Sequence, residues 1–240
     1  MIKLTIGIPV YEMKGNGVKH LTSLLKKLEK QTVFPTEILV SDNSINNLIE
    51  KYLDEYKSKN KIRYIKNKGQ KDPCSNLNNL INNSKGNYLK IVFQDDYPFT
   101  DEMIAKTIQR INESPRKRWF VCGSNNSKDD VNYFNTSIPY FNKNIYLGEN
   151  TIGSPSVLTI NNIDDALYFD NRYIWLLDCI YYYSLYQKFG PPEIINDILV
   201  TNGIHSNQLT STLTDKKKIK EVLFAIREFN NSPWKYFIQL

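Results

Sequence analysis

The stretch YLKIVFQDDYPFT, residues 88–100, decides how the rest of the chain is interpreted. Its first six residues are apolar except for a single Lys90, and Gly86 precedes them. A short apolar run of this kind, rich in β-branched and aromatic residues and opened by a glycine, is typical of a buried strand rather than of a helix. We therefore expect these residues to form a central strand.

Two neighbouring carboxylates, Asp95 and Asp96, follow Gln94 where this strand ends. Adjacent carboxylates repel each other, and neither is easily buried without a cation or a hydrogen-bond network. Ligands of open α/β sheets bind beyond the carboxyl ends of the strands, where such a pair can hold a divalent metal. The alternative interpretation is that Asp95 or Asp96 caps a helix that begins near Thr100.

Length and composition favour one large folded domain, with or without an appendage. Of the 240 residues, 41% are hydrophobic and 12% are aromatic, enough for a sizeable core, and wholesale disorder is therefore not expected. The formal charge of +6 favours anionic partners such as nucleotide phosphates. Nucleic acid is not an expected partner, because the basic residues are scattered and form no basic stripe.

The cysteines and the apolar runs bear on where the protein works. Cys74, Cys122 and Cys179 are an odd number without CxxC spacing, which argues against a disulfide framework and against a zinc site. We recognise no signal peptide, and no apolar run approaches the length of a membrane span. We therefore expect a cytoplasmic protein that is soluble or peripheral at the inner face of the membrane.

Strand and helix patterns alternate over the first hundred residues, which predicts a mostly parallel sheet with right-handed crossovers. No GxGxxG motif and no phosphate loop follows the first strand, so a dinucleotide site is not supported. The predicted strands are 4–10, 37–40, 62–65 and 88–93, and the predicted helices are 20–31, 47–56 and a short helix that ends at Gly86.

The second half of the chain is less regular. Residues 125–144 form a long polar and aromatic connection with little periodicity, which is expected to be functional or mobile. The aromatic tail with Trp234, Tyr236 and Phe237 either packs back on the domain or contacts a membrane or a partner. The predicted elements are helix 103–111, strand 119–122, the apolar run 157–160, a helix between Asp170 and Gly190, strand 198–201 and helix 216–229.

Two further carboxylates have open roles. Asp42 lies just past the second strand, where it either accepts hydrogen bonds from a ribose or base or forms a local turn with Ser44. Asp178 lies within a hydrophobic helix, where burial raises the pKa of a carboxyl group towards the range that a general base needs. The alternative is that Asp178 is exposed or paired with Arg172.

Six segments, in this order and at this spacing, resemble the family 2 glycosyltransferases, which have the GT-A fold. The resemblance runs from about Leu4 to about Thr212. The segments are IGIPVYE, EILVSDNS, NLNNLINNSKGNYLKIVFQDD, GSPSVL, WLLDC and HSNQLT, the last similar to a His-x-x-Gln-x-Thr segment of a bacterial branch.

The resemblance implies an α/β fold of the GT-A type, with a mostly parallel sheet flanked by helices and a C-terminal helical extension. Residues 1–212 would form the domain, with a nucleotide-sugar-binding half at 1–100 and an acceptor and catalytic-base half at 101–212. Residues 213–240 would add a helix and the aromatic tail. The implied activity is transfer of a sugar, with inversion, from a nucleotide-diphosphate donor to the hydroxyl group of a glycan, lipid-linked or protein-linked acceptor. A UDP-sugar is the favoured donor.

The resemblance also implies roles for individual residues. Asp178 would be the catalytic base, and Asp96, with His205 as a further contact, would hold a divalent metal, Mn²⁺ or Mg²⁺. The nucleotide-sugar pocket would consist of Pro9, Val10, Tyr11, Glu12, Asp42, Asn78, Gln94 and Asp95. The surroundings of the acceptor and the donor sugar would include Gly153, Ser154, Pro155, Ser156, Trp175 and Gln208.

The sequence departs from the family pattern at three positions. Gln94 replaces the first acid of the family's DxD motif, and Leu177 stands where the base motif usually has Glu. Leu77 replaces an Arg that often precedes the Asn at the position of Asn78, so Lys68, Lys71 or Lys90 would contact the diphosphate instead.

Two other interpretations stay open. One is a catalytically lapsed module that binds a glycan or a nucleotide, in which Asp96 and Asp178 have no catalytic duty. The other is a sugar nucleotidyltransferase, although the glycines of IPVYEMKGNG come too late for the phosphate loop of that class. A peripheral membrane contact through the basic, aromatic C-terminus is a further hypothesis.

Overall fold

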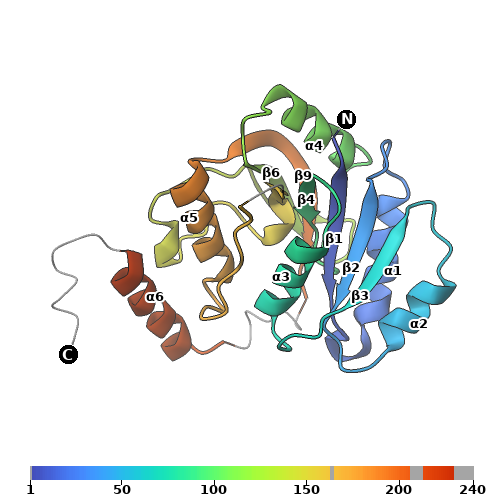
Figure 1. Ribbon diagram of the computed structural model, residues 1–240, viewed down its shortest axis with the longest axis horizontal. Coiled ribbons are helices and arrows are strands. Elements are labelled where there is room, and N and C mark those ends of the chain that lie inside the picture. The colour runs from blue at the N-terminus through green and yellow to red at the C-terminus, as the bar shows by residue number, and fades with distance from the viewer. Residues whose placement is uncertain (1, 163–164, 206–212, 230–240) are drawn as a thin grey trace.

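A mixed, nine-stranded β-sheet forms the centre of the structure, with helices on both faces (Figure 1). This computed structural model describes residues 2–162, 165–205 and 213–229. The strand order is β3-β2-β1-β4-β8-β6-β9-β5, with β7 paired to β6. The strands are β1 (Leu4–Val10), β2 (Glu37–Asp42), β3 (Ile62–Lys66), β4 (Tyr88–Ile91), β5 (Tyr97–Pro98), β6 (Trp119–Ser127), β7 (Tyr133–Ser137), β8 (Leu158–Asn161) and β9 (Glu193–Gly203).

The helices connect the strands much as the sequence predicts. Helices α1 and α2 lie on one face of the sheet, and α3 lies on the opposite face, in front of the sheet in Figure 1. The α-helices are α1 (Gly17–Leu28), α2 (Leu48–Glu55), α3 (Pro73–Asn83), α4 (Met103–Glu113), α5 (Leu177–Phe189) and α6 (Asp215–Phe229), and the 3₁₀ turns are η1 (Met13–Gly15), η2 (Ile145–Leu147) and η3 (Pro155–Val157).

The first half of the chain forms the parallel part of the sheet. β1 pairs in parallel with both β2 and β4, so that Gly7 lies opposite Leu39 on one side and Ile91 on the other. β3 extends the parallel part beyond β2. Because the carboxyl ends of parallel strands meet at one edge of a sheet, the polar residues that follow β1, β2 and β4 converge there. The candidate site is therefore at this edge of the sheet.

The second half adds antiparallel pairs, so the sheet is mixed. β8 is antiparallel to β4 and to β6, while β6 and β9 run in parallel. The expectation of an irregular connection over residues 125–144 is wrong in part, because β6 continues to Ser127 and β7 returns antiparallel to it. The polar residues Asn125 and Ser127 are buried within β6, since pairing with β9 uses their backbone groups. An apolar pattern therefore could not predict this strand.

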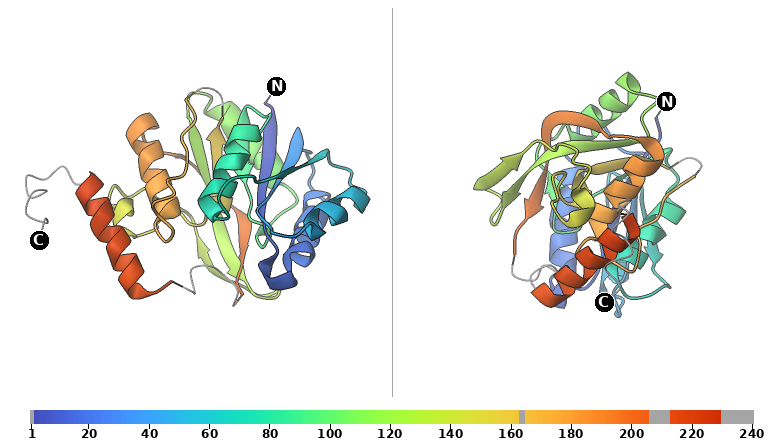
Figure 2. Two further views of the ribbon diagram at one scale, coloured as in Figure 1. Left: turned by 60° about the horizontal axis from the view of Figure 1, so that its bottom comes forward. Right: turned by 90° about the vertical axis from the view of Figure 1, so that its left-hand side faces the viewer.

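Helix α6 lies beside α5 at one end of the molecule, in both views of Figure 2. It contacts the turn η2. Among the residues that the structure describes, no helix combines the length and the apolar character needed to cross a membrane. The tail residues Trp234, Tyr236 and Phe237 lie outside the described residues.

Glu37, at the start of β2, joins its own strand to β1, to β3 and to the connection that leads into β4. Its side chain is 3% exposed and accepts hydrogen bonds from Thr5 Oγ1 at 3.0 Å, Lys85 N at 2.7 Å and Arg63 Nε at 2.9 Å. Burial alone would raise the pKa of Glu37, but Arg63 and the other donors outweigh it, and the pKa is lowered. Glu37 therefore stabilises the fold as a carboxylate.

We expect Glu37→Gln to lower the free energy of unfolding by about 2 kcal/mol, because it leaves Arg63 without its charged partner. The lowered pKa fixes the sign of the pH dependence. The stabilisation is complete above the unfolded pKa, near about 4.3, and is lost as the pH falls through the folded value. Urea unfolding at several pH values measures the difference. Glu50→Gln, on the exposed surface of α2, is the control, and equal losses in the two variants would contradict the assignment.

Candidate active site

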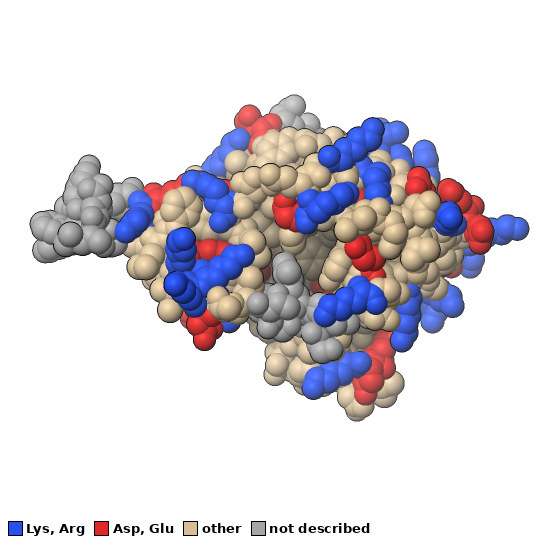
Figure 3. All heavy atoms as spheres, turned by 90° about the horizontal axis from the view of Figure 1, so that it is seen from below, with Lys and Arg blue, Asp and Glu red and all other residues tan. Residues whose placement is uncertain are grey.

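Polar residues from several strands meet where β1, β2 and β4 end. β1 runs from the top of Figure 1 towards its bottom, and Figure 3 shows the molecule from below. That face is hollowed at its centre, and Lys and Arg side chains lie around the rim (Figure 3). A basic rim of this kind favours an anionic ligand.

Asp96 is a buried carboxylate held by hydroxyl and amide donors. It is 4% exposed, and it accepts hydrogen bonds from Ser156 Oγ at 2.6 Å and from Gly203 N at 3.0 Å. Ser154 Oγ lies 3.5 Å from the same carboxylate. Burial and the charge of Asp95 raise the pKa of Asp96 well above its usual range, although these donors oppose the shift.

Asp95 and the two histidines of the chain form a cluster beside Asp96. His205 Nε2 lies 2.8 Å from Asp95 Oδ2, and the rings of His20 and His205 are 5.2 Å apart. Burial lowers the pKa of His20, despite the opposing charge of Asp95. The sequence analysis did not identify His20, because nothing in the residues around it in α1 connects it to His205.

The donor chemistry of Asp95, Asp96 and His205 fits a divalent cation. Two carboxylates and an imidazole are ligands that Mn²⁺ accepts, and carboxylates suit Mg²⁺. In the part of the chain that the structure describes, no Lys or Arg forms an ion pair with Asp95 or Asp96. No three His, Cys, Asp or Glu side chains of these residues are already arranged as a metal site. The alternative role as a helix cap is wrong, since Glu102 precedes α4.

The Gln94 side chain binds the backbone of Tyr11, the residue that follows β1. Gln94 is 2% exposed, its Oε1 accepts from Tyr11 N at 2.6 Å, and its Nε2 donates to Tyr11 O at 3.1 Å. A carboxylate at position 94 could not donate to the Tyr11 carbonyl oxygen. The amide therefore accounts for Gln in place of an acid here, and Tyr11 itself is 40% exposed.

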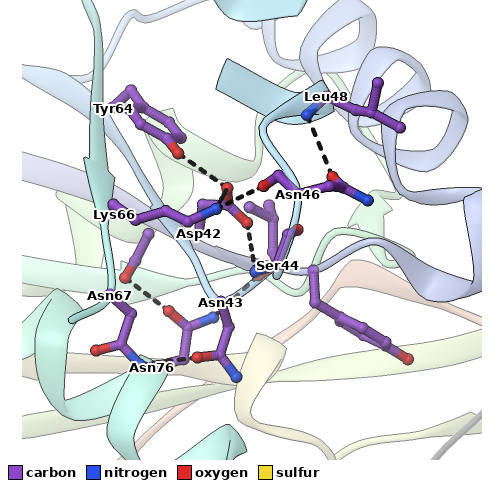
Figure 4. Close-up of polar contacts among 12 residues, drawn as sticks. Asp42, Asn43, Ser44, Asn46, Leu48, Tyr64, Lys66, Asn67 and Asn76 are labelled. Atoms are coloured by element: carbon purple, nitrogen blue, oxygen red, sulfur yellow. Dashed lines mark hydrogen bonds and ion pairs between the residues drawn. The ribbon is translucent and has the colours of Figure 1, made fainter. Parts of the chain in front are cut away.

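Asp42 is fully buried and completely engaged (Figure 4). Oδ1 accepts from Ser44 N at 2.8 Å, which confirms the local turn. Oδ2 accepts from Tyr64 OH at 2.9 Å and from Lys66 Nζ at 2.7 Å. Burial acts to raise the pKa of Asp42, but Lys66 and the other donors outweigh it, and the pKa is lowered. Contact with a ribose or base stays a prediction.

Asn78 and Lys90 hold parts of the fold together. Asn78 Nδ2 donates to Phe169 O at 2.9 Å, and Phe169 N donates to Asn78 Oδ1 at 2.8 Å, beside a polar groove of about 620 Å³ between α3 and residues 169–171. The Lys90 side chain is fully buried, and its Nζ donates to Ser156 O at 2.9 Å. The suggestion that Lys90 contacts the diphosphate is therefore wrong.

Asp178 lies in the first turn of α5, and its carboxylate is held from two sides. Oδ2 accepts from Asn150 Nδ2 at 2.7 Å, and Oδ1 accepts from Cys179 N at 2.8 Å. Burial raises the pKa of Asp178 to about 6. The alternative pairing with Arg172 is wrong, because Arg172 binds Asp170 at 2.5 Å and a carboxylate of α6 instead.

The segment GSPS connects the two carboxylate sites. Asn150 Oδ1 accepts from Gly153 N at 2.9 Å, and Gly153 has a φ of +116°, which favours glycine. On either side of Pro155, Ser156 donates to Asp96, while Ser154 Oγ donates to Asn202 Oδ1 at 2.7 Å and lies 3.5 Å from Asp96. Sequence analysis missed Asn150, because a side chain that caps a turn resembles any other loop asparagine.

The remaining predicted residues are placed as follows. Pro9 and Val10 lie opposite Ser41 and Asp42 in the sheet, and the Glu12 carbonyl oxygen accepts from the amides of the turn that follows it. The Trp175 ring packs against Gly148, where a Cβ atom would lie 2.7 Å from it. Gln208 lies outside the described residues.

An α/β sheet of this topology, with acidic residues beyond the strand ends and a separate carboxylate on a flanking helix, fits the GT-A class of glycosyltransferase domain. A model of the family described as "Glycosyl transferase family 2" matches residues 5–189. The chain therefore belongs to this family, and it is a glycosyltransferase. No curated protein matches the sequence.

Solved structures confirm the fold. TarS from S. aureus, residues 1–349 in complex with UDP-GlcNAc, is similar with a TM-score of 0.73 and 18% identity, over 97% of this chain and 68% of that one. The chain covers 46% of the longer TarS structure. The mannosyltransferase PcManGT from Pyrobaculum calidifontis, in complex with GDP-Man and Mn²⁺, has a TM-score of 0.62 and 11% identity, over 85% of this chain and 58% of that one.

We expect Gln94→Ala to weaken nucleotide binding, because it frees the Tyr11 backbone that the amide now holds. The same change leaves buried polar groups unpaired and should lower the free energy of unfolding by about 1–3 kcal/mol. Calorimetry with UDP and Mn²⁺ measures the first effect, and thermal unfolding measures the second. The matched control is Gln109→Ala on the exposed side of α4. Unchanged nucleotide affinity in Gln94→Ala would contradict a role of the Gln94–Tyr11 hydrogen bonds in nucleotide binding.

Proposed function

We propose that this glycosyltransferase inverts the anomeric centre, transferring a sugar from a nucleotide-diphosphate donor to a hydroxyl group of a glycan or glycoconjugate. The observation that carries the proposal is the position of Asp178, whose carboxylate is held by Asn150 in the first turn of α5, an element separate from the Asp95 and Asp96 pair. Single displacement needs a base on the opposite side of the sugar from the leaving group, and so on a different segment from the groups that hold the diphosphate.

In this mechanism Asp178 accepts the proton of the attacking acceptor hydroxyl group. Asn150 Nδ2 holds Asp178 Oδ2 in place, and Asp178 Oδ1 is held by the amide of Cys179. A carboxylate with a pKa near 6 is largely ionised at neutral pH and is still a better proton acceptor than an exposed one. The proton therefore passes from the acceptor hydroxyl oxygen to the Asp178 carboxylate as the glycosidic bond forms.

The acidic pair is the other half of the proposed mechanism. Asp95, Asp96 and His205 would hold a divalent cation, which, when bound, supplies Lewis-acid stabilisation of the leaving diphosphate. Ser156 and Gly203 orient Asp96 towards this task. His20, whose ring lies 5.2 Å from that of His205, would also lie near the diphosphate.

The proposed donor is a UDP-sugar. The similar structures bind UDP-GlcNAc in one case and GDP-Man with Mn²⁺ in the other, so both nucleotides belong in the test. Tyr11, which follows β1 and is 40% exposed, would stack on the base. We also propose the division into residues 1–100 for the donor and 101–212 for the acceptor, in a protein that works in the cytoplasm.

We expect a nucleotide to raise the melting temperature in a metal-dependent way, because a ligand that binds only the folded state stabilises it. The gain is about 2.7 kcal/mol at a hundred times the dissociation constant. UDP, GDP, CDP and dTDP are compared by thermal shift with and without Mn²⁺ or Mg²⁺. Asp96→Ala should lose the metal-dependent part, while Asp54→Ala, on the exposed side of α2, should keep it. No shift with any nucleotide would favour a lapsed glycan-binding module.

We expect the rate of donor hydrolysis to fall as the pH drops below about 6, because protonated Asp178 cannot accept a proton. Asp178→Asn should lower the rate by about 10²–10⁴-fold and remove this limb of the pH profile. Nucleotide affinity of Asp178→Asn is the control, and it should match the wild type. A variant that keeps the rate and the pH limb would exclude Asp178 as the base.

A further inference from the structure

Glu221 is a buried carboxylate of α6 that no step of the proposed reaction uses. Its side chain is 7% exposed, and α6 lies beyond residues 5–189, which the family model matches. A buried carboxylate is retained at a cost unless hydrogen bonds compensate it. The partners of Glu221 therefore indicate what it does.

The partners are three consecutive backbone amides next to the candidate base. Glu221 Oε2 accepts from the amide nitrogens of Ile174 at 3.1 Å, Trp175 at 2.9 Å and Leu176 at 3.0 Å. The Ile174 amide also reaches Oε1 at 3.1 Å. Asp178 follows Leu176 by two residues, in the first turn of α5.

Glu221 holds the turn that leads into α5. Ile174, Trp175 and Leu176 precede the first helical residue, Leu177, so Glu221 pairs the amides of this turn and not the N–H groups of the first helical turn. A negative charge at this end of α5 is also favoured by the helix dipole. α5 begins at Leu177 rather than shortly after Asp170 as the sequence suggested.

A second contact joins α6 to the same segment without touching those amides. Glu228 Oε1 lies 2.7 Å from Arg172 Nη2, and Glu228 Oε2 accepts from Tyr173 OH at 2.9 Å. These contacts hold α6 on the segment before α5, but at a greater distance along the chain from Asp178. Glu228 is therefore a matched control for the docking of α6.

We propose that Glu221 is a positioning residue, which fixes the turn 174–176 and thereby sets the Asp178 carboxylate against Asn150. The inference rests on the proposed function in one respect, the role of Asp178 as the base. It makes α6 a part of the catalytic unit rather than an appendage. A base displaced by about 1 Å can cost a reaction 10²-fold in rate, so a contact that sets its position acts on the chemical step.

The test compares Glu221→Ala with Glu228→Ala in the full chain, with UDP-GlcNAc and Mn²⁺ as probes. Glu221→Ala should lower kcat for hydrolysis by about 10- to 100-fold and leave KM for the donor nearly unchanged. Glu221→Gln should recover part of the loss, because its carbonyl oxygen can replace Oε2 as the acceptor. Glu228→Ala should keep kcat close to that of the wild type. Equal kcat in Glu221→Ala and Glu228→Ala would overturn the proposal.

A second measurement does not depend on activity. We expect the pKa of Asp178, followed by ¹³C NMR of its carboxyl carbon, to fall from about 6 towards its ordinary value in Glu221→Ala, because the released turn admits water. Among the described residues, the titratable groups whose charges couple to Asp178 are Cys179 and Tyr182. Burial raises the pKa of both, so neither changes charge in this range. Asp178→Asn identifies the resonance.

This second measurement separates the two proposals. If the wild type hydrolyses no nucleotide sugar, the proposed function fails, and the titration alone then decides the role of Glu221. A lowered pKa in Glu221→Ala but not in Glu228→Ala supports positioning, and an unchanged pKa overturns it. If Glu221→Ala does not fold, Glu221→Asp carries the same test, since its carboxylate is one methylene group short of the amides. Unchanged kcat and titration in Glu221→Asp would overturn the proposal.

Discussion

The structure depends on how one buried carboxyl group, that of Asp96, is accommodated between β4 and β5. Asp96 is held by Ser156 and by the amide of Gly203, and neither donor carries a charge. Hydrogen bonds from neutral groups reduce the cost of burying a carboxylate but do not neutralise it, especially beside Asp95. The site therefore favours a cation, and the two donors come from the turn η3 and from the end of β9.

This accommodation requires a close approach between chain segments that are far apart in sequence. A Cβ atom at Gly203 would lie 2.1 Å from the Asp95 carbonyl oxygen, so only glycine allows the end of β9 to reach the acidic pair. His205 follows two residues later and contacts Asp95. The length of β9 and the position of this glycine thus bring His205 to Asp95.

Sequence reasoning predicted the parts of the site that follow from local patterns. The apolar strand that ends in Asp95 and Asp96 was visible, because burial and chain order fix where such a strand ends. The hydrophobic residues around Asp178 left two interpretations open, a carboxyl group with a raised pKa and an exposed or paired one, and burial does raise its pKa. Asn150 and Glu221 could not be predicted from the sequence. Asn150 contacts the Asp178 carboxylate, and Glu221 contacts the backbone amides of residues 174–176, and only the fold brings these partners together. The polar end of β6 was missed for a related reason, since its pairing with β9 leaves no apolar pattern.

Gln94 has a consequence for how this sequence can change over evolution. Its amide both accepts from and donates to the Tyr11 backbone, and an acid at this position can only accept. Restoring the acid of the family motif would add a possible metal ligand and at the same time disrupt the end of β1. The two effects oppose each other, so the reversal is expected to be tolerated only after a compensating change near Tyr11. Position 94 is thus an epistatic position, at which the preferred residue depends on how the first strand ends.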